Sequence, residues 1–578
     1  MKKNFRAIAA ICTCQLLSSI SFGQSVYEKL DYADDNAGSM DLNDVIISID
    51  SVDIVNVGFF KDTPGATYRD HGVLINRTTG GTLNWAYDYG AQDVNGKKMH
   101  MVLNSLVEVS TGGYILVGAL NKASNKHAAI PGDGDVILLR VDANGQVTQA
   151  VHVDIANRMD VAYSIIPEDA NNNSFIICGS TASTSNATKD GFLMKIDPNL
   201  NISWLKEIEL RQSSLVGTAV DLFDIAMDGS VIWAVGSIVD TNSVNSDGLV
   251  VKFLSNGTYQ TSRRANKLTD REVFYHVEND NSSNLIITGN SAKVVFHSAD
   301  NRMIALKYAK SSHTIPLIRY LKTSDGAGGF LPNVGYDINK HSSDGGGYFV
   351  VGVADGTTVP TIGVFQHLNN SLIPVSQYNM SSNGDVVLHA LAVSDNSEKF
   401  VVSSGLNTTG ASSRGYELKS NFSGYTGCSD SVGVYQDSLS INTDSLLATI
   451  YNTYYRDTLY IVRDSVLDSL LCLDSLNFGF TPNSYLLNDF QSQSLFLFPN
   501  PARVGEIIQP RVGREEIILE ITLFDIMGKP CQFRMTEGNQ WQVMTDGLDE
   551  GVYRVQIKYL DKDGWEQYKS VQLSLFHG

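Results

Sequence analysis

The chain has 578 residues, a formal net charge of -19 at pH 7, 18% charged residues and 49 glycines. A chain this acidic repels phosphate backbones and anionic lipid, which argues against nucleic acid and against electrostatic docking on a membrane surface. Its length exceeds one simple core and suits a large repeat domain with appendages.

The first 23 residues have the features of a secretory signal peptide. Basic residues open the chain, an apolar run extends from Ala7 to Leu17, and the small residues Ser21 and Gly23 stand just before Gln24. No later segment approaches the ~18 apolar residues that a membrane helix needs. We therefore expect cleavage after Gly23, a secreted or cell-surface location, and no membrane span.

Seven short apolar segments each end at a glycine, at intervals of 53 to 63 residues. A repeat of this length indicates one supersecondary unit copied in series. We predict an all-β protein whose residues 25–428 form a seven-bladed β-propeller. Crowding by neighbouring backbone, or a bulge at the strand end, explains the glycines better than a ring of ligand contacts does. The repeat glycines are Gly58, Gly118, Gly179, Gly236, Gly289, Gly352 and Gly405.

Residues 160–210 show how one copy is built. Four short apolar or alternating segments are separated by polar, turn-forming stretches, which is the pattern of a four-stranded antiparallel blade. In several copies the third segment follows an aspartate and ends on a basic residue. We interpret these basic residues as side chains that reach solvent from the strand end. They are Arg140, Lys195, Lys252 and Lys307.

The two ends of the repeat region predict how the ring closes. The last copy has a poor fourth strand, because the stretch from Phe422 to Cys428 is rich in glycine. The stretch from Tyr27 to Tyr32 aligns with the fourth strands of other copies. We therefore predict that the N-terminal strand completes the last blade, which removes the open edge.

Residues 429–494 change in character and are predicted to form a linker or stalk. β-branched and aromatic residues favour an extended stalk, although a seven-residue spacing also fits a coiled coil. Whether Cys428 and Cys472 pair stays open. The triplet Asp-Ser/Thr-aliphatic recurs here and resembles the O-glycosylation acceptor of Bacteroidetes. Its aspartates, expected to be solvated, are Asp430, Asp437, Asp444, Asp457, Asp464, Asp468 and Asp474.

Residues 495–578 form a separate module, for which strand patterns and glycine turns predict a small β-sandwich. Three blocks in order, Pro-Asn-Pro, Asp-Ile-Met-Gly-Lys and Gly-Leu through Gly-Val-Tyr, resemble the type A C-terminal sorting domain of the Bacteroidetes type IX secretion system. The resemblance implies the secretion machinery as a partner, export through the periplasm and across the outer membrane, and removal of this module. The motif residues are Pro499, Asn500, Pro501, Asp525, Gly528, Lys529, Gly547, Gly551 and Tyr553.

Catalytic motifs are scarce. The 11 histidines show no metal-ligand spacing, and the chain has no HExxH, GxSxG or P-loop motif. We expect no metal and no cofactor. Tyr275-His276 and Arg319-Tyr320 together offer an acid, a base and a charge stabiliser of the kind a polysaccharide lyase uses. A half-buried strand histidine is the simpler interpretation of His276.

The function predicted first is a secreted or surface-displayed propeller that binds a glycan or a protein at one face of the ring, without catalysis. A polysaccharide lyase or glycosidase acting at the centre of the ring is the first alternative. A structural or adhesion component of the cell surface is the second. The candidate binding loops are Asn121–Asp133, Ser180–Lys189, Ser237–Ser246 and Thr323–Pro332.

Overall fold

The described elements of the computed structural model are all strands. They fall into two units, Met1–Asp474 and Ser475–Gly578, which we describe separately. Among the described residues no helix is long and apolar enough to cross a membrane. The structure describes residues 27–33, 39–61, 70–92, 98–120, 134–155, 159–169, 171–182, 189–211, 218–240, 246–266, 270–293, 301–324, 330–342, 346–355, 361–380, 385–394, 399–409, 412–422, 430–431, 435–438, 442–445, 447–451, 455–458, 460–473, 496–498, 502–503, 507–511, 517–524, 530–531, 534–536, 542–544, 551–560 and 566–576.

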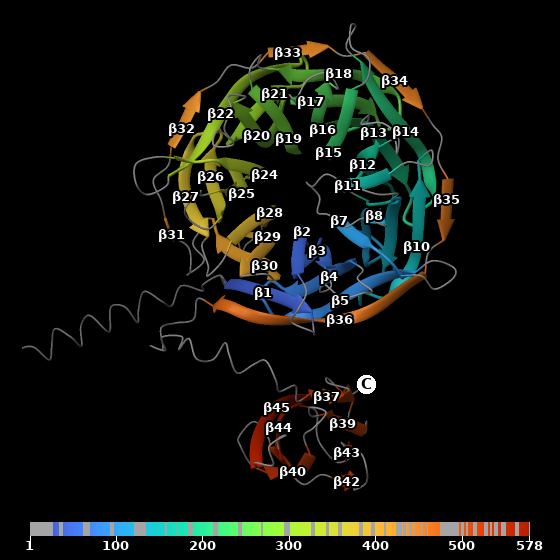
Figure 1. The fold of residues 1–578 in the computed structure, drawn as a ribbon, viewed down its shortest axis with the longest axis vertical. Helices are drawn as coiled ribbons and strands as arrows, with labels where there is room; N and C mark the ends of the chain where they lie inside the picture. The colour runs from blue at the N-terminus through green and yellow to red at the C-terminus, as the bar shows by residue number, and fades with distance from the viewer. Residues whose placement is uncertain are drawn as a thin grey trace, which may run out of the picture. The chain divides into compact units, whose positions relative to one another are not determined.

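The first unit is a ring of seven antiparallel blades, which confirms the predicted seven-bladed propeller (Figure 1). In each blade the first strand is nearest the ring axis and the fourth is near the rim. Blade 1 contains β2 (Ser39–Ile47), β3 (Asp53–Lys61), β4 (Asp70–Thr78) and β5 (Leu83–Gln92), with β6 (Lys98–Met99) beside β5; blade 2 contains β7 (Met101–Glu108), β8 (Tyr114–Leu120), β9 (Val136–Val141) and β10 (Val147–Asp154); blade 3 contains β11 (Met159–Pro167), β12 (Phe175–Ala182), β13 (Lys189–Ile196) and β14 (Ile202–Arg211); blade 4 contains β15 (Thr218–Asp228), β16 (Val231–Asp240), β17 (Ser246–Leu254) and β18 (Tyr259–Asn266); blade 5 contains β19 (Asp270–Asn279), β20 (Asn284–Lys293), β21 (Asn301–Ala309) and β22 (Thr314–Ser324), with β23 (Phe330–Leu331) beside β22; blade 6 contains β24 (Asn333–His341), β25 (Gly347–Ala354), β26 (Ile362–Asn369) and β27 (Pro374–Met380); blade 7 contains β28 (Asp385–Ser394), β29 (Phe400–Thr409) and β30 (Ser412–Asn421).

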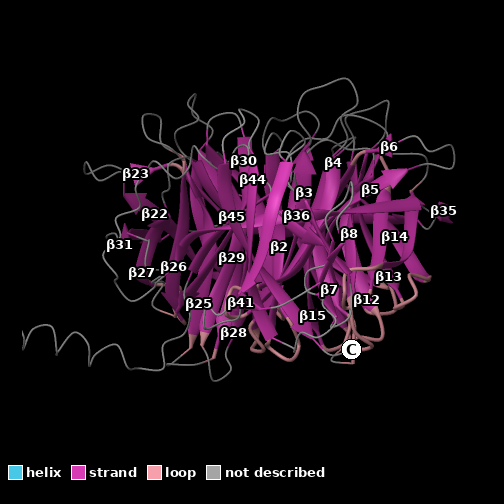
Figure 2. Cartoon of the chain, turned by 90° about the horizontal axis from the view of Figure 1, so that it is seen from below, coloured by secondary structure: helices cyan, strands magenta, loops and turns pink. Residues whose placement is uncertain are grey.

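The hydrophobic core lies between the blades, which pack face to face. Inner strands are therefore buried on both faces, and they read in the sequence as continuous apolar runs; all seven residues of β8 are buried. Between blades 2 and 3, Ile115 and Leu138 join Phe192 in one cluster. Loops join the strands at the ends of the blades (Figure 2). Those between third and fourth strands are tight turns, where Gly145 and Gly257 take φ values of 71° and 82°.

A bulge interrupts the first strand of every blade, opposite the repeat glycine of the second strand. In blade 4 the register shifts between Leu222 and Asp224, and Leu222 is the partner of Gly236. A Cβ atom on Gly236 would lie 1.8 Å from the carbonyl oxygen of Asp221. At each of the other six repeat glycines, an added Cβ atom would lie 1.9 Å from a carbonyl oxygen. The close backbone approach therefore explains the glycine in each copy.

The first and last blades meet in one 10-stranded sheet. Strand β1 (Tyr27–Ala33) pairs antiparallel with β30, so that Leu30 lies opposite Tyr416. Strand β36 (Tyr460–Leu473) pairs with β5 at one end and with β1 at the other. The first and last strands of this unit are thus paired together where blade 7 adjoins blade 1 (Figure 1).

Further short strands of the segment that follows blade 7 lie around the rim of the ring (Figure 1). Each pairs with the outer strand of a different blade. Among the described residues of 430–473 every element is a strand. These elements are β31 (Asp430–Ser431), β32 (Tyr435–Ser438), β33 (Asn442–Ser445), β34 (Leu447–Tyr451), β35 (Tyr455–Thr458) and β36.

The second unit contains two sheets. That these sheets form a β-sandwich stays a prediction. Leu523 and Val555 are buried in it. Of the sorting-motif residues, Gly551 and Tyr553 lie in β44, while the other seven, like the signal peptide, lie outside the described residues. One sheet has the order β37 (Phe496–Phe498), β39 (Ile507–Arg511), β43 (Gln542–Met544), β42 (Arg534–Thr536); the other has β38 (Ala502–Arg503), β45 (Glu566–Phe576), β44 (Gly551–Leu560), β40 (Ile517–Phe524), β41 (Pro530–Cys531).

Candidate functional site at the ring axis

The seven bulges place one side chain per blade around the ring axis. A bulged residue has no partner in the strand ladder, so its side chain is not held to the two faces of the sheet. The first strands surround the axis (Figure 1). Their bulged residues therefore lie in a circle around it. From blade 1 to blade 7 they are Asn43, Asn104, Tyr163, Phe223, Tyr275, Tyr336 and His389.

Five of these residues form a continuous aromatic arc across blades 3 to 7. The ring centroids of Tyr163 and Phe223 are 5.2 Å apart, and those of Phe223 and Tyr275 are 5.3 Å apart. Tyr336 follows at 5.4 Å from Tyr275, and His389 at 5.2 Å from Tyr336. All four contacts are tilted, an arrangement that aromatic pairs favour.

Polar contacts complete the circle through blades 1 and 2. The amide of Asn43 donates to the carbonyl oxygen of Leu103 at 2.8 Å. The amide of Asn104 donates to the carbonyl oxygen of Ala162, also at 2.8 Å. His389 returns to blade 1, where its Nε2 lies 3.2 Å from Oδ1 of Asp41. Most of the circle is buried, whereas Tyr275 and Tyr336 are half-buried and so reach solvent.

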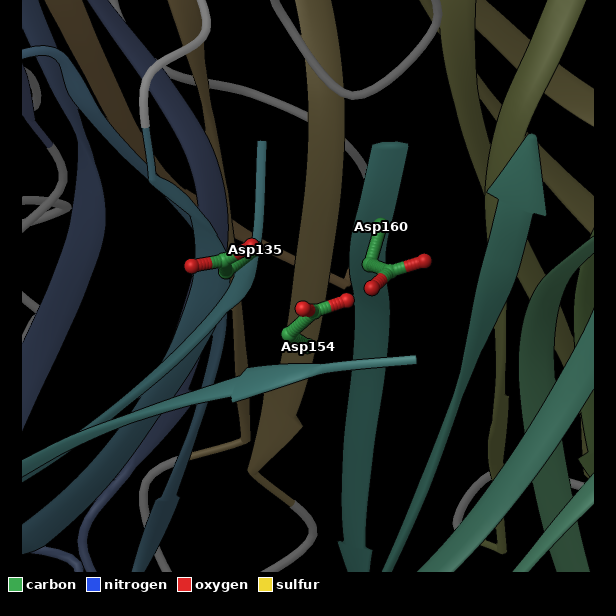
Figure 3. A group of neighbouring side chains, drawn as sticks. All are labelled: Asp135, Asp154 and Asp160. Atoms are coloured by element: carbon green, nitrogen blue, oxygen red, sulfur yellow. The ribbon is translucent and has the colours of Figure 1, made fainter. Parts of the chain in front are cut away.

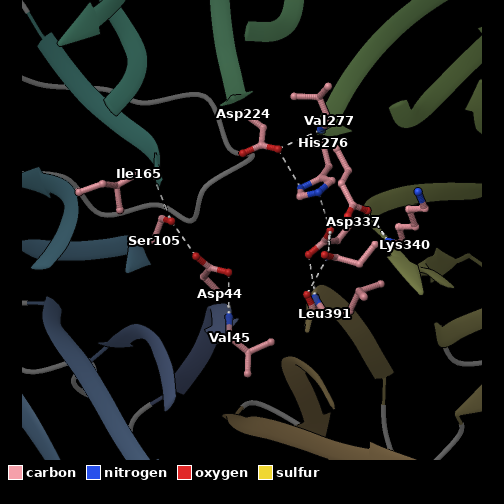
Figure 4. A network of polar contacts seen from close by, with 12 residues as sticks. Asp44, Val45, Ser105, Ile165, Asp224, His276, Val277, Asp337, Lys340 and Leu391 are labelled. Carbon is pink, nitrogen blue, oxygen red and sulfur yellow. Dashed lines mark hydrogen bonds and ion pairs between the residues drawn. The ribbon is translucent and has the colours of Figure 1, made fainter. Parts of the chain in front are cut away.

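In six of the seven blades the residue after the bulge is polar, and these residues form a second layer in which several contacts join neighbouring blades (Figure 4). In blade 7 this position is Ala390. Asp44 accepts hydrogen bonds from Ser105 at 2.6 Å and from the Leu106 N–H at 3.3 Å. Asp224 accepts from the Val277 N–H at 2.9 Å, and Asp337 from the Leu391 N–H at 2.8 Å. These carboxylates satisfy backbone donors of the next blade, which gives them a structural role.

His276 connects three blades in this layer. Its Nδ1 lies 2.9 Å from Oδ2 of Asp224 in blade 4, and its Nε2 lies 3.2 Å from Oδ1 of Asp337 in blade 6. Burial alone would lower the pKa of His276, but Asp224 and Asp337 outweigh it and raise the pKa to about 9. Burial raises the pKa of Glu278, two residues on, to about 7, against the opposing charge of His276. At neutral pH His276 is therefore an imidazolium ion held on both sides.

This arrangement predicts how stability depends on pH. Since the pKa of His276 is raised, the imidazolium stabilises the fold fully below pH 6.5, and the contribution is lost as the pH rises toward 9. We expect the wild type to exceed His276→Gln in unfolding free energy by roughly 3 kcal/mol at pH 6, and by much less at pH 9. Urea unfolding of both proteins at the two pH values measures this.

Glu278→Gln is the control for the neighbouring carboxyl group. The raised pKa of Glu278 makes stability fall mainly as the pH rises from 4.5 to 7. The Glu278→Gln protein should therefore keep the fall between pH 7 and 9. A difference between wild type and His276→Gln that stays constant from pH 6 to 9 would contradict the assignment.

The structure places the four residues proposed for catalysis in two separate locations. Tyr275 and His276 are on β19, the innermost strand of blade 5. Arg319 and Tyr320 are on β22, the fourth strand, which two strands separate from β19. At about 4.8 Å per strand step, the two pairs lie roughly 14 Å apart. Tyr320 is buried, with its hydroxyl 3.3 Å from Ser291 Oγ.

The basic residues at the ends of third strands contact their own or the next blade. Arg140 donates to the carbonyl oxygens of Tyr114 and Gly112 at 3.1 and 2.5 Å. Lys195 Nζ lies 2.6 Å from Oε2 of Glu168. Lys252 and Lys307 lie over the rings of Trp233 and Tyr348, at 4.9 and 5.8 Å from the centroids. Each therefore has a local partner, which supports their interpretation as strand-end residues.

Three carboxylates gather where blade 2 adjoins blade 3 (Figure 3). One oxygen from each of Asp135, Asp154 and Asp160 lies within 4.8 Å of the others. Asp135 also contacts Nδ1 of His152 at 2.7 Å, and Asp160 accepts the Ile155 N–H at 2.5 Å. Oxygen ligands of this kind suit a hard cation. The contacts of Asp135 and Asp160 within the protein already give these two residues structural roles.

Sequence reasoning did not find the axial circle. Its members differ in type, and their distance to the repeat glycine varies, so that no motif marks them. Aligning the seven copies on the glycine would therefore not bring these residues into one column, and only the strand pairing places them at one position. The candidate binding loops lie partly or wholly outside the described residues; 121–133 is wholly outside.

No family model and no curated protein matches the chain. Among solved structures, one described as the extracellular domain of a hybrid two-component system from B. thetaiotaomicron matches at 8% identity. It covers 93% of this chain and 68% of that one, with a TM-score of 0.21. A second, described as the extracellular domain of a one-component system from the same organism, matches at 9% identity over 93% and 92%, with a TM-score of 0.15. Scores this low carry no argument about function.

Proposed function

We propose that this protein is an extracellular, non-catalytic propeller that binds a glycan at the ring axis. The aromatic arc carries the proposal, because four successive blades each place an aromatic ring at the same position of the repeat. Ligand sites are commonly lined by aromatic groups with a few polar ones nearby. A pyranose has C–H groups on its faces and hydroxyl groups at its edge, which suits the aromatic rings and the carboxylate of Asp41 beside His389.

The half-buried pair Tyr275 and Tyr336 offers the test. We expect Tyr275→Ala/Tyr336→Ala to weaken glycan binding by about 5- to 150-fold, because two aromatic contacts worth about 0.5–1.5 kcal/mol each are removed. A glycan array identifies ligands for the wild type, and calorimetry then compares the variants. Tyr259→Ala is the matched control, since it removes a half-buried tyrosine from the outer strand β18. Equal loss in both proteins, or no ligand on the array, would reject an axial glycan site.

A polysaccharide lyase or glycosidase is the second candidate. Glu278 favours it, because a carboxyl group with a pKa of about 7 suits general acid-base catalysis. Against it, the imidazolium form of His276 is not available as a base at neutral pH. Incubation with uronate-containing and neutral polysaccharides, followed by absorbance of unsaturated products and by reducing ends, separates the two candidates. Turnover of a polysaccharide would contradict a function in binding alone.

We also propose export by the type IX secretion system, with residues 495–578 as a sandwich-like sorting module and the N-terminal strand closing the ring. The motif blocks of the sequence and the two sheets of the second unit support the first part. The pairing of β1 with β30 supports the second. The type IX machinery would be the export partner, and a surface-protein ligand or an adhesive role stays an alternative. Deletion of 495–578 should leave the protein in the periplasm, as fractionation would show.

A further inference from the structure

The strands around the rim follow the blades one by one, in the order opposite to the chain. Strand β31 pairs with β27 of blade 6, and β32 with β22 of blade 5. Next, β33 pairs with β18 of blade 4, β34 with β14 of blade 3, and β35 with β10 of blade 2. The series ends where β36 pairs with β5 of blade 1. All six pairings are antiparallel, so each blade gains an outermost strand.

The recurring aspartates meet the same position of successive blades. In blade 5, Asp437 lies opposite Tyr320, Tyr320 opposite Ile304, and Ile304 opposite the repeat glycine. In each of the other five blades, the same series of opposite residues runs from the repeat glycine through the third and fourth strands to one residue of the rim strand. The resulting pairs are Asp430 with Asn379, Asp437 with Tyr320, Asp444 with Arg264, Tyr451 with Glu207, Asp457 with His152, and Asp464 with Asp88.

The spacing of the triplets agrees with the size of the ring. Aromatic centroids near the axis are 5.2–5.4 Å apart, and seven such steps enclose a circle with a radius of about 6 Å. The rim strands lie four strand steps of about 4.8 Å outside this circle, which gives the rim a radius of roughly 25 Å. One-seventh of the circumference at that radius, the share of one blade, is about 23 Å. Seven extended residues span about 23 Å as well. An acceptor motif for a modification would need no such spacing.

We propose that residues 430–465 are a strand belt that docks on the outer edges of blades 6 to 1, and that the Asp-Ser/Thr-aliphatic repeat sets its register in five of these six blades. In blade 3 Tyr451 takes the position of the aspartate. The interaction surface is the row of outer strand edges, and its partner is this segment of the same chain, bound by strand addition. The belt covers edges that would otherwise pair with other chains. Its last strand, β36, also joins blade 1 to β1.

Disulfide trapping tests the register in the full chain. Arg263 lies opposite Ser445, and Arg264 lies opposite Asp444. Opposite pairs in antiparallel strands alternate between a hydrogen-bonded kind and a closer, non-hydrogen-bonded kind, so one of these two pairs is the closer kind. Cysteine pairs are introduced at both positions, with Cys428, Cys472 and Cys531 replaced by serine. The matched controls join Arg263→Cys to Ser438→Cys, and Arg264→Cys to Asp437→Cys, which are the same triplet positions one blade away.

We expect at least one of the predicted pairs to cross-link at least tenfold more than its control, as measured by mass spectrometry of peptides. Equal cross-linking to the control position, or none at either predicted pair, would overturn the proposal. Hydrogen exchange on the unmodified protein gives an independent answer. Amides of β33 and β34 should exchange at least a hundredfold more slowly than an unstructured chain, whereas unprotected amides would show that the segment is a free spacer.

Discussion

Gly236→Ala should prevent the propeller from folding to a stable state. The new Cβ atom would lie 1.8 Å from the carbonyl oxygen of Asp221 and 2.8 Å from its carbonyl carbon. Both are backbone atoms of the bulged inner strand, which cannot rotate away as a side chain does. We expect a loss of at least about 4 kcal/mol in the free energy of unfolding, which is typical of severe defects in a protein core.

Gly80→Ala is the matched control, because the same added methyl group would meet Thr78 Oγ1 at 3.6 Å, an ordinary contact. Its unfolding free energy should stay within about 0.5 kcal/mol of the wild type. Soluble yield, circular dichroism and urea unfolding compare the two variants. If Gly236→Ala folded normally and lost only ligand binding, the glycine would be a ligand contact and the backbone explanation would be wrong.

The architecture was predictable because one backbone constraint repeats in every copy. A glycine that must lie against a carbonyl oxygen tolerates no substitute, so Gly58 and its six equivalents mark the blades in the sequence. Apolar runs such as β8 mark strands that are buried on both faces. The number of blades follows from counting these marks, and it needs no knowledge of how the blades pack.

The axial site could not be predicted in the same way, because a bulge leaves the side chain free to vary. Asn43 and Phe223 occupy equivalent positions, yet they share neither size nor polarity. The ion pairs of His276 are likewise invisible in sequence, since its two partners come from the blades on either side. Spacing along the chain reports contacts within a blade, whereas these contacts depend on the ring.

Glu417→Ala should be the most damaging substitution at the contact between the last blade and the first. Glu417 of β30 accepts a hydrogen bond from the Asn56 amide, and its Oε2 lies 4.0 Å from Nε of Arg77. All three side chains are fully buried. Removing the carboxylate takes an ion-pair partner away from the fully buried Arg77 guanidinium. We therefore expect a loss of about 3–5 kcal/mol in the free energy of unfolding, measured by urea denaturation.

Two further variants separate charge from packing. Arg77→Met/Glu417→Leu removes both charges and should regain part of the loss; the rest remains because the Asn56 amide has lost its acceptor. Asp247→Ala breaks a pair of similar type, Arg264 to Asp247 at 3.1 Å, whose side chains are 15% and 17% exposed. That loss should be near 1 kcal/mol, because solvent screens the pair.

These comparisons bear on how the ring holds together. Neighbouring blades make contact mainly through apolar clusters, such as the large one between blades 2 and 3. The apolar cluster that contains Val45 and Ala390 and joins blade 7 to blade 1 is smaller, and this contact also includes the buried charges of Arg77 and Glu417. Buried polar groups are costly unless they are paired, so this contact forms well only in one register of the two blades. If Glu417→Ala cost no more than Asp247→Ala, closure would depend on the paired strands at the rim and not on the buried charges.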